Sequence, residues 1–234
     1  MGLLKKKIII FLGPPGSGKG TVCQTIVGSN KKIVHFSVGT LCRKYANEDT
    51  ALGKSIKNLI DKGNLISFEN ISLIINDCLD QFFFDSSFDV LLLDGFPRNN
   101  DQAFLLVEIY KKFFDKISFY FILLDAEEAV LKDRMHHRLI CSNNLCEKIY
   151  SQKNSKLLMC CSHCSADLFR RKDDMPEIIE KRLQYYFSQK NLIFDVFQKC
   201  AFEISIFDTN KSNDLFILEL ENFFKLKNIN IYLK

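Results

Sequence analysis

The stretch IIIFLGPPGSGKGT, from Ile8 to Thr21, passes from a run of apolar residues into a segment rich in glycine and proline. The apolar run predicts a buried strand, and the spacing of the residues from Gly20 to Val27 predicts a helix directly after it. In the turn between them, glycines let successive backbone N–H groups point at an anion, and the helix adds the positive end of its dipole. Lys19 would supply a mobile positive charge for the β- and γ-phosphates of a nucleotide. The stretch therefore predicts a phosphate-binding loop rather than a tight turn without a ligand.

The rest of the chain continues this alternation of strands and helices. Apolar runs of strand length occur at residues 8–12, 33–36, 88–93, 117–124 and 202–207. Helical spacing occurs at residues 20–27, 71–82, 103–113, 126–138 and 177–197. Strands that alternate with helices predict a parallel β-sheet covered by helices on both faces. We therefore expect an α/β core with a parallel β-sheet flanked by helices.

Composition limits the class of protein. A chain of 234 residues that is 47% hydrophobic can bury one substantial core with an insert. The apolar run before Gly13 is shorter than that of a secretion signal, and no run approaches the length of a membrane span. The net charge of +4 is too small to indicate nucleic-acid binding. We expect a cytoplasmic protein that binds neither membrane nor nucleic acid, with a monomer as the default.

Cysteines are concentrated in one segment. Of nine in the chain, an odd number that argues against a complete set of disulfides, five lie between Cys141 and Cys164. The surrounding segment, Ile140 to Asp174, is polar and lacks a helical period, so it looks like an insertion. The other four, Cys23, Cys42, Cys78 and Cys200, lie among apolar residues and are expected to be small core residues.

The clustered cysteines predict a structural zinc site. Cys141 and Cys146 form one pair and Cys161 and Cys164 another, close to the spacing of a four-thiolate zinc site. Cys160 lies next to Cys161, so the choice between them is open, and the nearby histidine at position 163 could compete. The alternative is an insert of reduced cysteines without metal.

Four ordered stretches resemble motifs of the adenylate kinase family. The loop at 13–21 is similar to the family's GxPGxGKGT, and LLLDGFPRNNDQA (91–103) to its DGFPR…Q segment. DRMHHR (133–138) resembles the DR…R helix before the family's lid, and RRKDDMPEIIEKRLQYY (170–186) the R-x-D-D…R segment after it. The resemblance, which spans nearly the whole chain, implies a long-lid member with a zinc-binding lid. It implies a core at 1–138 and 175–234, which includes an AMP-binding helical segment at about 37–66, and a lid insert at 139–174.

The family's activity implies transfer of the γ-phosphoryl group from MgATP to AMP, giving two ADP. The acceptor is already an anionic phosphate oxygen, so positioning and charge neutralisation matter more than a general base. Arginines suit this task because the planar guanidinium binds two phosphate oxygens at once. Asp94 ends a buried strand, where its carboxylate would meet Mg²⁺ or its waters, although it could also be a helix cap or a surface residue.

The resemblance also assigns individual residues. The ATP site would comprise Gly16, Ser17, Gly18, Lys19, Gly20, Thr21, Arg134, Arg138, Ile149, Tyr150 and Lys211. The AMP site would comprise Val38, Gly39, Arg43, Asn64, Leu65, Ile66, Gly95, Phe96, Pro97, Arg98, Gln102, Arg171 and Arg182. The catalytic residues would be Lys19, Asp94, Arg98, Arg134, Arg138, Arg171 and Arg182. Any one of these arginines taken alone could instead be a solvated surface charge.

Gln102 and two departures from the family pattern bear on the acceptor. The carboxamide of Gln102 can pair with the N1 and N6 edge of adenine, which favours AMP. The family's STGD reads SVGT here, so Val38 replaces a hydroxyl that faces the acceptor base and Thr40 replaces an Asp near the metal waters. AMP preference and Mg²⁺ use are therefore open to change. In FDTNK (207–211) the family's glycine is missing, so contacts to the donor adenine would be mainly from the backbone.

Other functions compete with this reading. The acceptor could be UMP or CMP, or the enzyme could be of the GTP:AMP type. A P-loop GTPase-like switch is suggested by NKSND (210–214), but its Asp is one residue late and Gly20 replaces the Ser or Thr that binds Mg²⁺. A zinc-ribbon nucleic-acid module is suggested by the cysteines, but the chain lacks stacking motifs and a basic tract. AMP-dependent formation of ADP separates the kinase from the last two.

Overall fold

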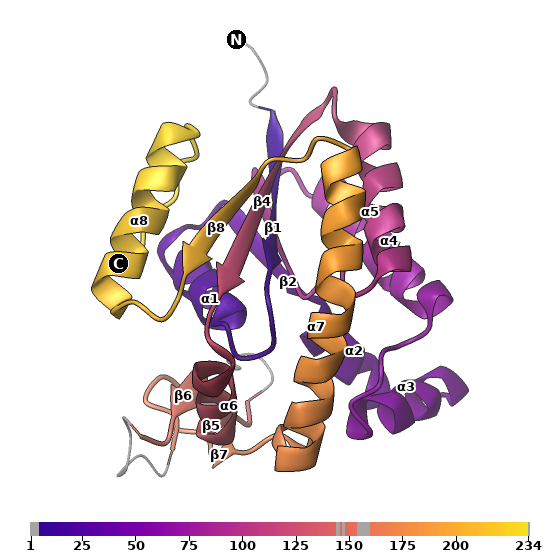
Figure 1. The fold of residues 1–234 in the computed structure, drawn as a ribbon, viewed down its shortest axis with the longest axis vertical. Coiled ribbons are helices and arrows are strands. Elements are labelled where there is room, and N and C mark those ends of the chain that lie inside the picture. The colour runs from indigo at the N-terminus through magenta and orange to yellow at the C-terminus, as the bar shows by residue number, and fades with distance from the viewer. Residues whose placement is uncertain (1–4, 144–145, 147, 154–159, 234) are drawn as a thin grey trace.

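The computed structural model describes residues 5–143, 146, 148–153 and 160–233. Its core is a five-stranded, all-parallel sheet in the order β2-β3-β1-β4-β8 (Figure 1). The strands are β1 (Lys6–Leu12), β2 (Ile33–Ser37), β3 (Val90–Asp94), β4 (Ile117–Asp125) and β8 (Ile204–Asp208). The expected parallel sheet flanked by helices is thus confirmed.

Helices cover both faces of this sheet. One face packs against α1 (Lys19–Ser29) and α8 (Asn213–Leu226), whose buried side chains belong to one core (Figure 1). The other packs against α2 (Val38–Ala46), α4 (Phe68–Phe84), α5 (Asn100–Phe113) and α7 (Pro176–Lys199), while α3 (Ala51–Asp61) packs on α2 and extends this core. None of the described helices is long and apolar enough to cross a membrane.

The apolar residues of β1 contribute to the cores on both faces of the sheet. Side chains alternate across a strand, so Ile8 and Ile10 join the core under α4 and α5, whereas Ile9 and Phe11 join the core under α1 and α8. All four are at most 1% exposed. This is why β1 reads as a continuous apolar run, as parallel strands buried on both faces do.

The insert forms a small sheet of its own at the carboxyl ends of the core strands (Figure 1). Its antiparallel strands are β5 (Arg138–Cys141), β6 (Ile149–Ser151) and β7 (Leu168–Phe169), in the order β6-β5-β7, followed by the 3₁₀ turn η1 (Lys172–Asp174). The helix predicted at 126–138 is shorter, α6 (Glu128–His136). It ends because Arg138 already pairs with Ser151 as the first residue of β5.

Candidate functional site

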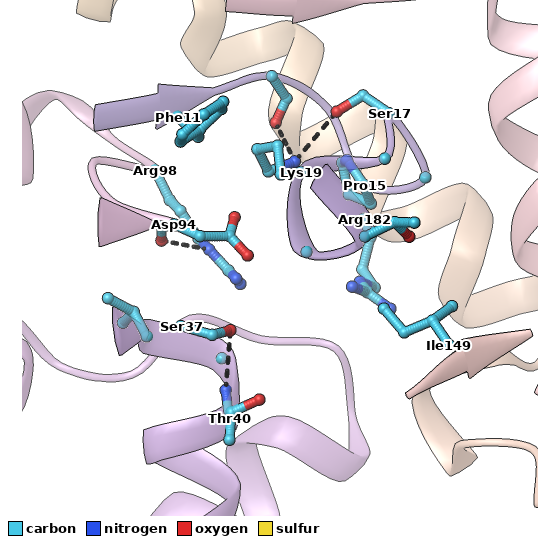
Figure 2. Close-up of a pocket in the computed structure, with 18 of the residues that line it drawn as sticks. Phe11, Pro15, Ser17, Lys19, Ser37, Thr40, Asp94, Arg98, Ile149 and Arg182 are labelled. Carbon is cyan, nitrogen blue, oxygen red and sulfur yellow. Dashed lines mark hydrogen bonds between the residues drawn. The ribbon is translucent and has the colours of Figure 1, made fainter. Parts of the chain in front are cut away.

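The carboxyl ends of the core strands, the lid sheet and α7 enclose a cavity of about 590 Å³. In open parallel sheets this edge is the usual place for ligands. The cavity is lined by every residue that the sequence assigns to the ATP site, the AMP site or catalysis, from Gly16 in the loop after β1 to Lys211 after β8. Figure 2 shows how the labelled residues face one another across it.

The loop after β1 has the backbone that a phosphate cradle requires. Gly13 has a φ of +137°, and a Cβ there would lie 2.2 Å from the carbonyl oxygen of Leu124, so no other residue fits. The ammonium of Lys19 folds back onto the loop and donates to the carbonyls of Gly13 and Pro14, at 2.9 and 2.8 Å. Figure 2 shows how the Lys19 side chain turns toward the loop. It also contacts Ser17 Oγ at 3.2 Å. A bound phosphate would replace these three oxygens as partners of the lysine.

Desolvation makes this lysine easier to deprotonate. Burial lowers the pKa of Lys19 to about 8, with a further lowering from Arg98 and Arg182, although Asp94 opposes the shift. Phosphate oxygens would provide the missing negative charge. A polyphosphate is therefore the kind of ligand that keeps this amine charged.

Asp94 ends β3 and points at the phosphate loop. A Cβ on Gly20 would lie 3.7 Å from Asp94 Oδ2. Burial opposes ionisation of Asp94, but the imidazole of His35 and the charges of Lys19 and Arg98 together lower its pKa. A buried, ionised carboxylate beside a phosphate loop fits Mg²⁺, which proteins hold with one or two carboxylates, waters and substrate phosphates.

A close backbone approach positions Arg98. Gly95 has a φ of +84°, and a Cβ there would lie 2.9 Å from Arg98 Nη2. The Arg98 side chain can therefore fold over the turn and donate from Nε to the Gly95 carbonyl at 2.8 Å (Figure 2). At the start of α2, Gly39 lies beneath the guanidinium groups of both Arg98 and Arg43, which come within 3.3 and 3.4 Å of a Cβ built there. The two arginines thus converge on one point.

Thr40 contributes to the same corner. Its hydroxyl accepts a hydrogen bond from Arg43 Nη2 at 3.2 Å, and its backbone N–H donates to Ser37 Oγ, the N-cap of α2 (Figure 2). Val38 beside it is 2% exposed. The replacements at positions 38 and 40 therefore leave an apolar wall and a neutral partner for Arg43.

Gln102 is held in place at the N-terminus of α5. It is 2% exposed, its backbone N–H donates to the capping residue Asn99, and its Oε1 accepts the backbone N–H of Arg98 at 2.8 Å. A carbonyl oxygen has two lone pairs, so Oε1 can still accept a second hydrogen bond. The carboxamide is thus presented to the cavity in a fixed orientation.

Two buried aspartates connect the arginines at the end of the lid. Asp174, whose side chain is fully buried, accepts hydrogen bonds from Arg138 Nε at 2.8 Å and from Arg182 Nη1 at 3.3 Å. Asp173 Oδ2 lies 3.0 Å from Arg182 Nη1. Burial and the charges of Arg43 and Arg138 lower the pKa of neighbouring Arg171 to about 9. The cations outnumber their carboxylates here, so an anionic ligand would relieve their repulsion.

The end of the cavity near β8 combines elements from separate parts of the chain. Arg134 on α6 donates to the hydroxyl and the carbonyl of Thr209, at 3.1 and 2.6 Å. Lys211, also after β8, pairs with Glu219 on α8 at 2.6 Å, so its amine is directed at that carboxylate. Ile149 of β6 lies over the phosphate loop, with Cδ1 3.4 Å from a Cβ built on Gly20. The lid thus contacts the loop directly.

The lid brings four cysteine sulfurs together. The Sγ atoms of Cys141, Cys146, Cys161 and Cys164 all lie within 4.8 Å of one another. Cys141 and Cys164 are 3.3 Å apart and Cys146 and Cys161 are 3.7 Å apart. Four thiolates at about 2.3 Å from a tetrahedral Zn²⁺ would be separated by nearly these distances. The cluster therefore fits a structural zinc ion, and it includes Cys161 rather than the exposed Cys160.

Several residues of the cavity have no role in the sequence analysis. Thr209 and Asp173 line the cavity and Asp174 is buried beside it. All three lie in stretches whose motifs depend on other residues, and only the structure shows which arginine each one binds. His35 is the central residue of β2, with Nε2 3.8 Å from Asp94 Oδ2. Among the described residues, this nitrogen is the buried side-chain polar atom that lacks a hydrogen-bond partner. A single histidine in an apolar run carries no sequence signal for such a position.

Comparison with known proteins agrees with this geometry. A family model described as "Adenylate kinase" matches residues 11–202. The adenylate kinase of Borrelia garinii subsp. bavariensis is 36% identical over 194 residues, which cover 82% of this chain and 87% of the relative. The adenylate kinase of Chlamydia trachomatis serovar D is 33% identical over 81% of this chain and 78% of the relative. That of Petrotoga mobilis is 30% identical over 82% and 85%. The chain therefore belongs to the adenylate kinase family and is a nucleoside monophosphate kinase.

Proposed function

We propose that the enzyme transfers the γ-phosphoryl group of MgATP reversibly to AMP, giving two ADP. The observation that carries this proposal is the cavity itself, in which a phosphate loop and a buried carboxamide are separated by a ring of guanidinium groups. The phosphate loop suits the donor triphosphate, and the carboxamide of Gln102 suits the adenine of the acceptor. The enzyme would thereby maintain the balance of adenine nucleotides.

In this proposal, the arginines align the reacting phosphates. Arg98 and Arg43 hold the phosphate of AMP, while Arg138, Arg171 and Arg182 surround the γ-phosphoryl group between the nucleotides. An oxygen of the AMP phosphate forms the new bond to the γ-phosphorus, and the bond to the β,γ-bridging oxygen breaks. The electron pair of the broken bond stays on the β-phosphate, which leaves as ADP. No proton has to be removed from the acceptor.

Other residues bind and shield the nucleotides. Lys19 and the loop N–H groups hold the donor phosphates, and Arg134 and Thr209 lie beside the donor nucleoside. Asp94 is the carboxylate that would hold Mg²⁺. When bound, Mg²⁺ neutralises charge on the β- and γ-phosphates. The lid, with Ile149 over the loop, keeps water from the γ-phosphate and so suppresses hydrolysis. We also propose that the lid cysteines hold a structural Zn²⁺.

An acceptor other than AMP is the second candidate. Buried Val38 offers no hydrogen bond to an acceptor base, which weakens the case for adenine at that wall. A pyrimidine nucleotide such as UMP or CMP is smaller and would leave Gln102 to provide the selectivity alone. A GTP:AMP type of enzyme would differ instead at the donor site. Gln102 favours AMP over these alternatives because the oxygen of its carboxamide can accept from N6 of adenine and its NH₂ group can donate to N1.

The test is formation of ADP from ATP with AMP, GMP, CMP or UMP as acceptor, and from GTP with AMP, each with Mg²⁺ present or chelated. We expect Mg²⁺-dependent turnover with ATP and AMP that exceeds the other pairs by at least about 10²-fold. A Val38→Thr variant, which restores the hydroxyl, is expected to lower KM for AMP without changing KM for ATP. Turnover mainly with another acceptor would refute the assignment of AMP, and hydrolysis of ATP without an acceptor would refute the kinase reaction.

A further inference from the structure

Tyr150 lies between the cysteine cluster and the phosphate loop. It is the central residue of β6, and its hydroxyl oxygen is 3.1 Å from Cys161 Sγ and 3.1 Å from Ser162 Oγ. Its neighbour Ile149 has the opposite contact, with Cδ1 over Gly20 of the phosphate loop. Successive residues of a strand point to opposite faces. One short strand thus contacts the cysteine cluster on one side and the phosphate loop on the other.

The hydrogen bond has a defined direction once the cysteine is a metal ligand. A thiolate bound to Zn²⁺ has no proton, so the Tyr150 hydroxyl must donate to Cys161. The Ser162 hydroxyl can then donate to the Tyr150 oxygen. Such partners of ligating atoms orient the ligand and are worth about 10–100-fold in metal affinity. Tyr150 is therefore placed to hydrogen-bond a zinc ligand without binding the metal itself.

The strand β6 is short, and few other contacts hold it in place. Within the part of the chain that the structure describes, its three residues pair with one strand, β5, through Arg138, Leu139 and Ile140. The chain on either side of it is connected to the cysteine cluster, with Cys146 before the strand and Cys161 after it. The hydrogen bond of Tyr150 is thus the side-chain contact that joins the strand to the cluster. If that bond is lost, the register of β6 against the loop has less support.

We propose that Tyr150 is a positioning residue that transmits the state of the lid metal to the ATP site. Through its bond to Cys161, the metal centre holds β6 so that Ile149 packs on Gly20 and closes the space above the donor phosphates. Zinc binding and ATP binding are then thermodynamically coupled, and each strengthens the other. The AMP side of the cavity, built from α2, β3 and α5, lies outside this connection. The proposal rests on the proposed function in taking ATP as the donor at this loop.

The test uses the zinc-loaded full chain and three variants. Tyr150→Phe removes only the hydroxyl, Ser162→Ala removes the other partner of that hydroxyl, and Ile149→Ala removes the contact with the loop but not the bond to sulfur. For each we would measure the rate of zinc release to an excess of a chromogenic chelator. We would also measure Kd for a non-hydrolysable ATP analogue and Kd for AMP, with and without zinc. None of these readings requires turnover, so a failure of the proposed reaction can be distinguished from a failure of this proposal.

For Tyr150→Phe we expect zinc release to be faster by about 10–100-fold and Kd for the ATP analogue to rise, with Kd for AMP unchanged. Removal of zinc from the wild type should raise Kd for the ATP analogue. Removal of zinc from Tyr150→Phe should raise this Kd by a smaller factor. Ser162→Ala should release zinc and bind the ATP analogue as the wild type does. Ile149→Ala should raise Kd for the ATP analogue without changing the rate of zinc release. The proposal is overturned if Tyr150→Phe releases zinc at the wild-type rate. The proposal is also overturned if Tyr150→Phe binds the ATP analogue as the wild type does, or if its Kd values for the analogue and for AMP rise alike. It is overturned as well if the wild type binds no zinc.

Discussion

At the scale of single residues, Lys19 shows how the cavity is prepared for anions. Its ammonium donates to three neutral oxygens of the loop, and burial lowers its pKa to about 8 despite the charge of Asp94. Above that pH the free enzyme increasingly holds a neutral amine. Only the protonated form attracts the donor phosphates, so the apparent affinity should follow the protonated fraction.

The first prediction concerns this titration. Kd for a non-hydrolysable ATP analogue should be nearly constant below pH 7 and should rise above pH 8 by a factor that approaches tenfold per pH unit. The folded-state pKa is lowered from 10.5, so the charge is lost earlier than in a solvated lysine. Calorimetric titration between pH 6 and 9.5 measures the effect.

The matched control is Lys19→Arg, since a guanidinium stays charged throughout this range. Its Kd is expected to be higher than in the wild type but flat between pH 8 and 9.5. A rise of the same slope in the arginine variant would show that another group is responsible.

At the scale of elements, the lid combines a minimal sheet with a cluster of cysteines. The strand β7 has only two residues and β6 only three. Sheets of this size do not fold alone in water, so a metal ion held by the four sulfurs would provide much of the stability of the insert. A tetrahedral thiolate site has no open position, which makes a structural role the expected one.

The second prediction identifies the ligands. Cys161→Ser should lose bound zinc, because its sulfur belongs to the cluster, whereas Cys160→Ser should retain one zinc per chain, because residue 160 is exposed. The two residues are adjacent and the substitution is the same, so each variant is the control for the other. Metal analysis after gel filtration gives the stoichiometry. Loss of zinc in Cys160→Ser with retention in Cys161→Ser would contradict the arrangement of the sulfurs.

At the scale of the whole molecule, Asp174 joins the lid to the core. It lies in η1 at the end of the insert, and it binds Arg138 at the beginning of the lid sheet and Arg182 on α7. A buried carboxylate between two cations neutralises charge that would otherwise be buried without a partner. The ion pairs of Asp174 thus link the lid sheet to α7.

The third prediction tests this connection. Asp174→Asn keeps the shape but removes the charge, and it should lower the free energy of unfolding by at least about 3 kcal/mol at pH 7, as expected when one partner of a buried ion pair is removed. It should also lower kcat, since both arginines lose their alignment. Asp133→Asn is the control, because Asp133 pairs with Lys153 at 2.6 Å but is 45% exposed and should unfold like the wild type. Urea unfolding followed by circular dichroism compares them, and equal losses would refute the special role of Asp174.

Much of this architecture could be predicted from local patterns. The runs at β1 and β3 predict buried parallel strands because each side chain faces one of two cores. The phosphate loop and the cysteine pairs could be found because their spacing is short and their chemistry is specific. The length of α6 could not be found, because Arg138 belongs to a strand whose partners lie beyond a loop. The bonds of Arg134 to Thr209, 75 residues away, likewise depend on contacts that no local pattern encodes.

The order of the core sheet also has a consequence for how the protein is made. The first strand of the chain, β1, is central, and its neighbours β3 and β4 end only at Asp94 and Asp125. A ribosome that adds 5–20 residues per second leaves this apolar strand without both partners for on the order of 10 s. During translation, Ile8 to Leu12 is thus a bare strand with both edges open, the kind of segment that chaperones protect from aggregation.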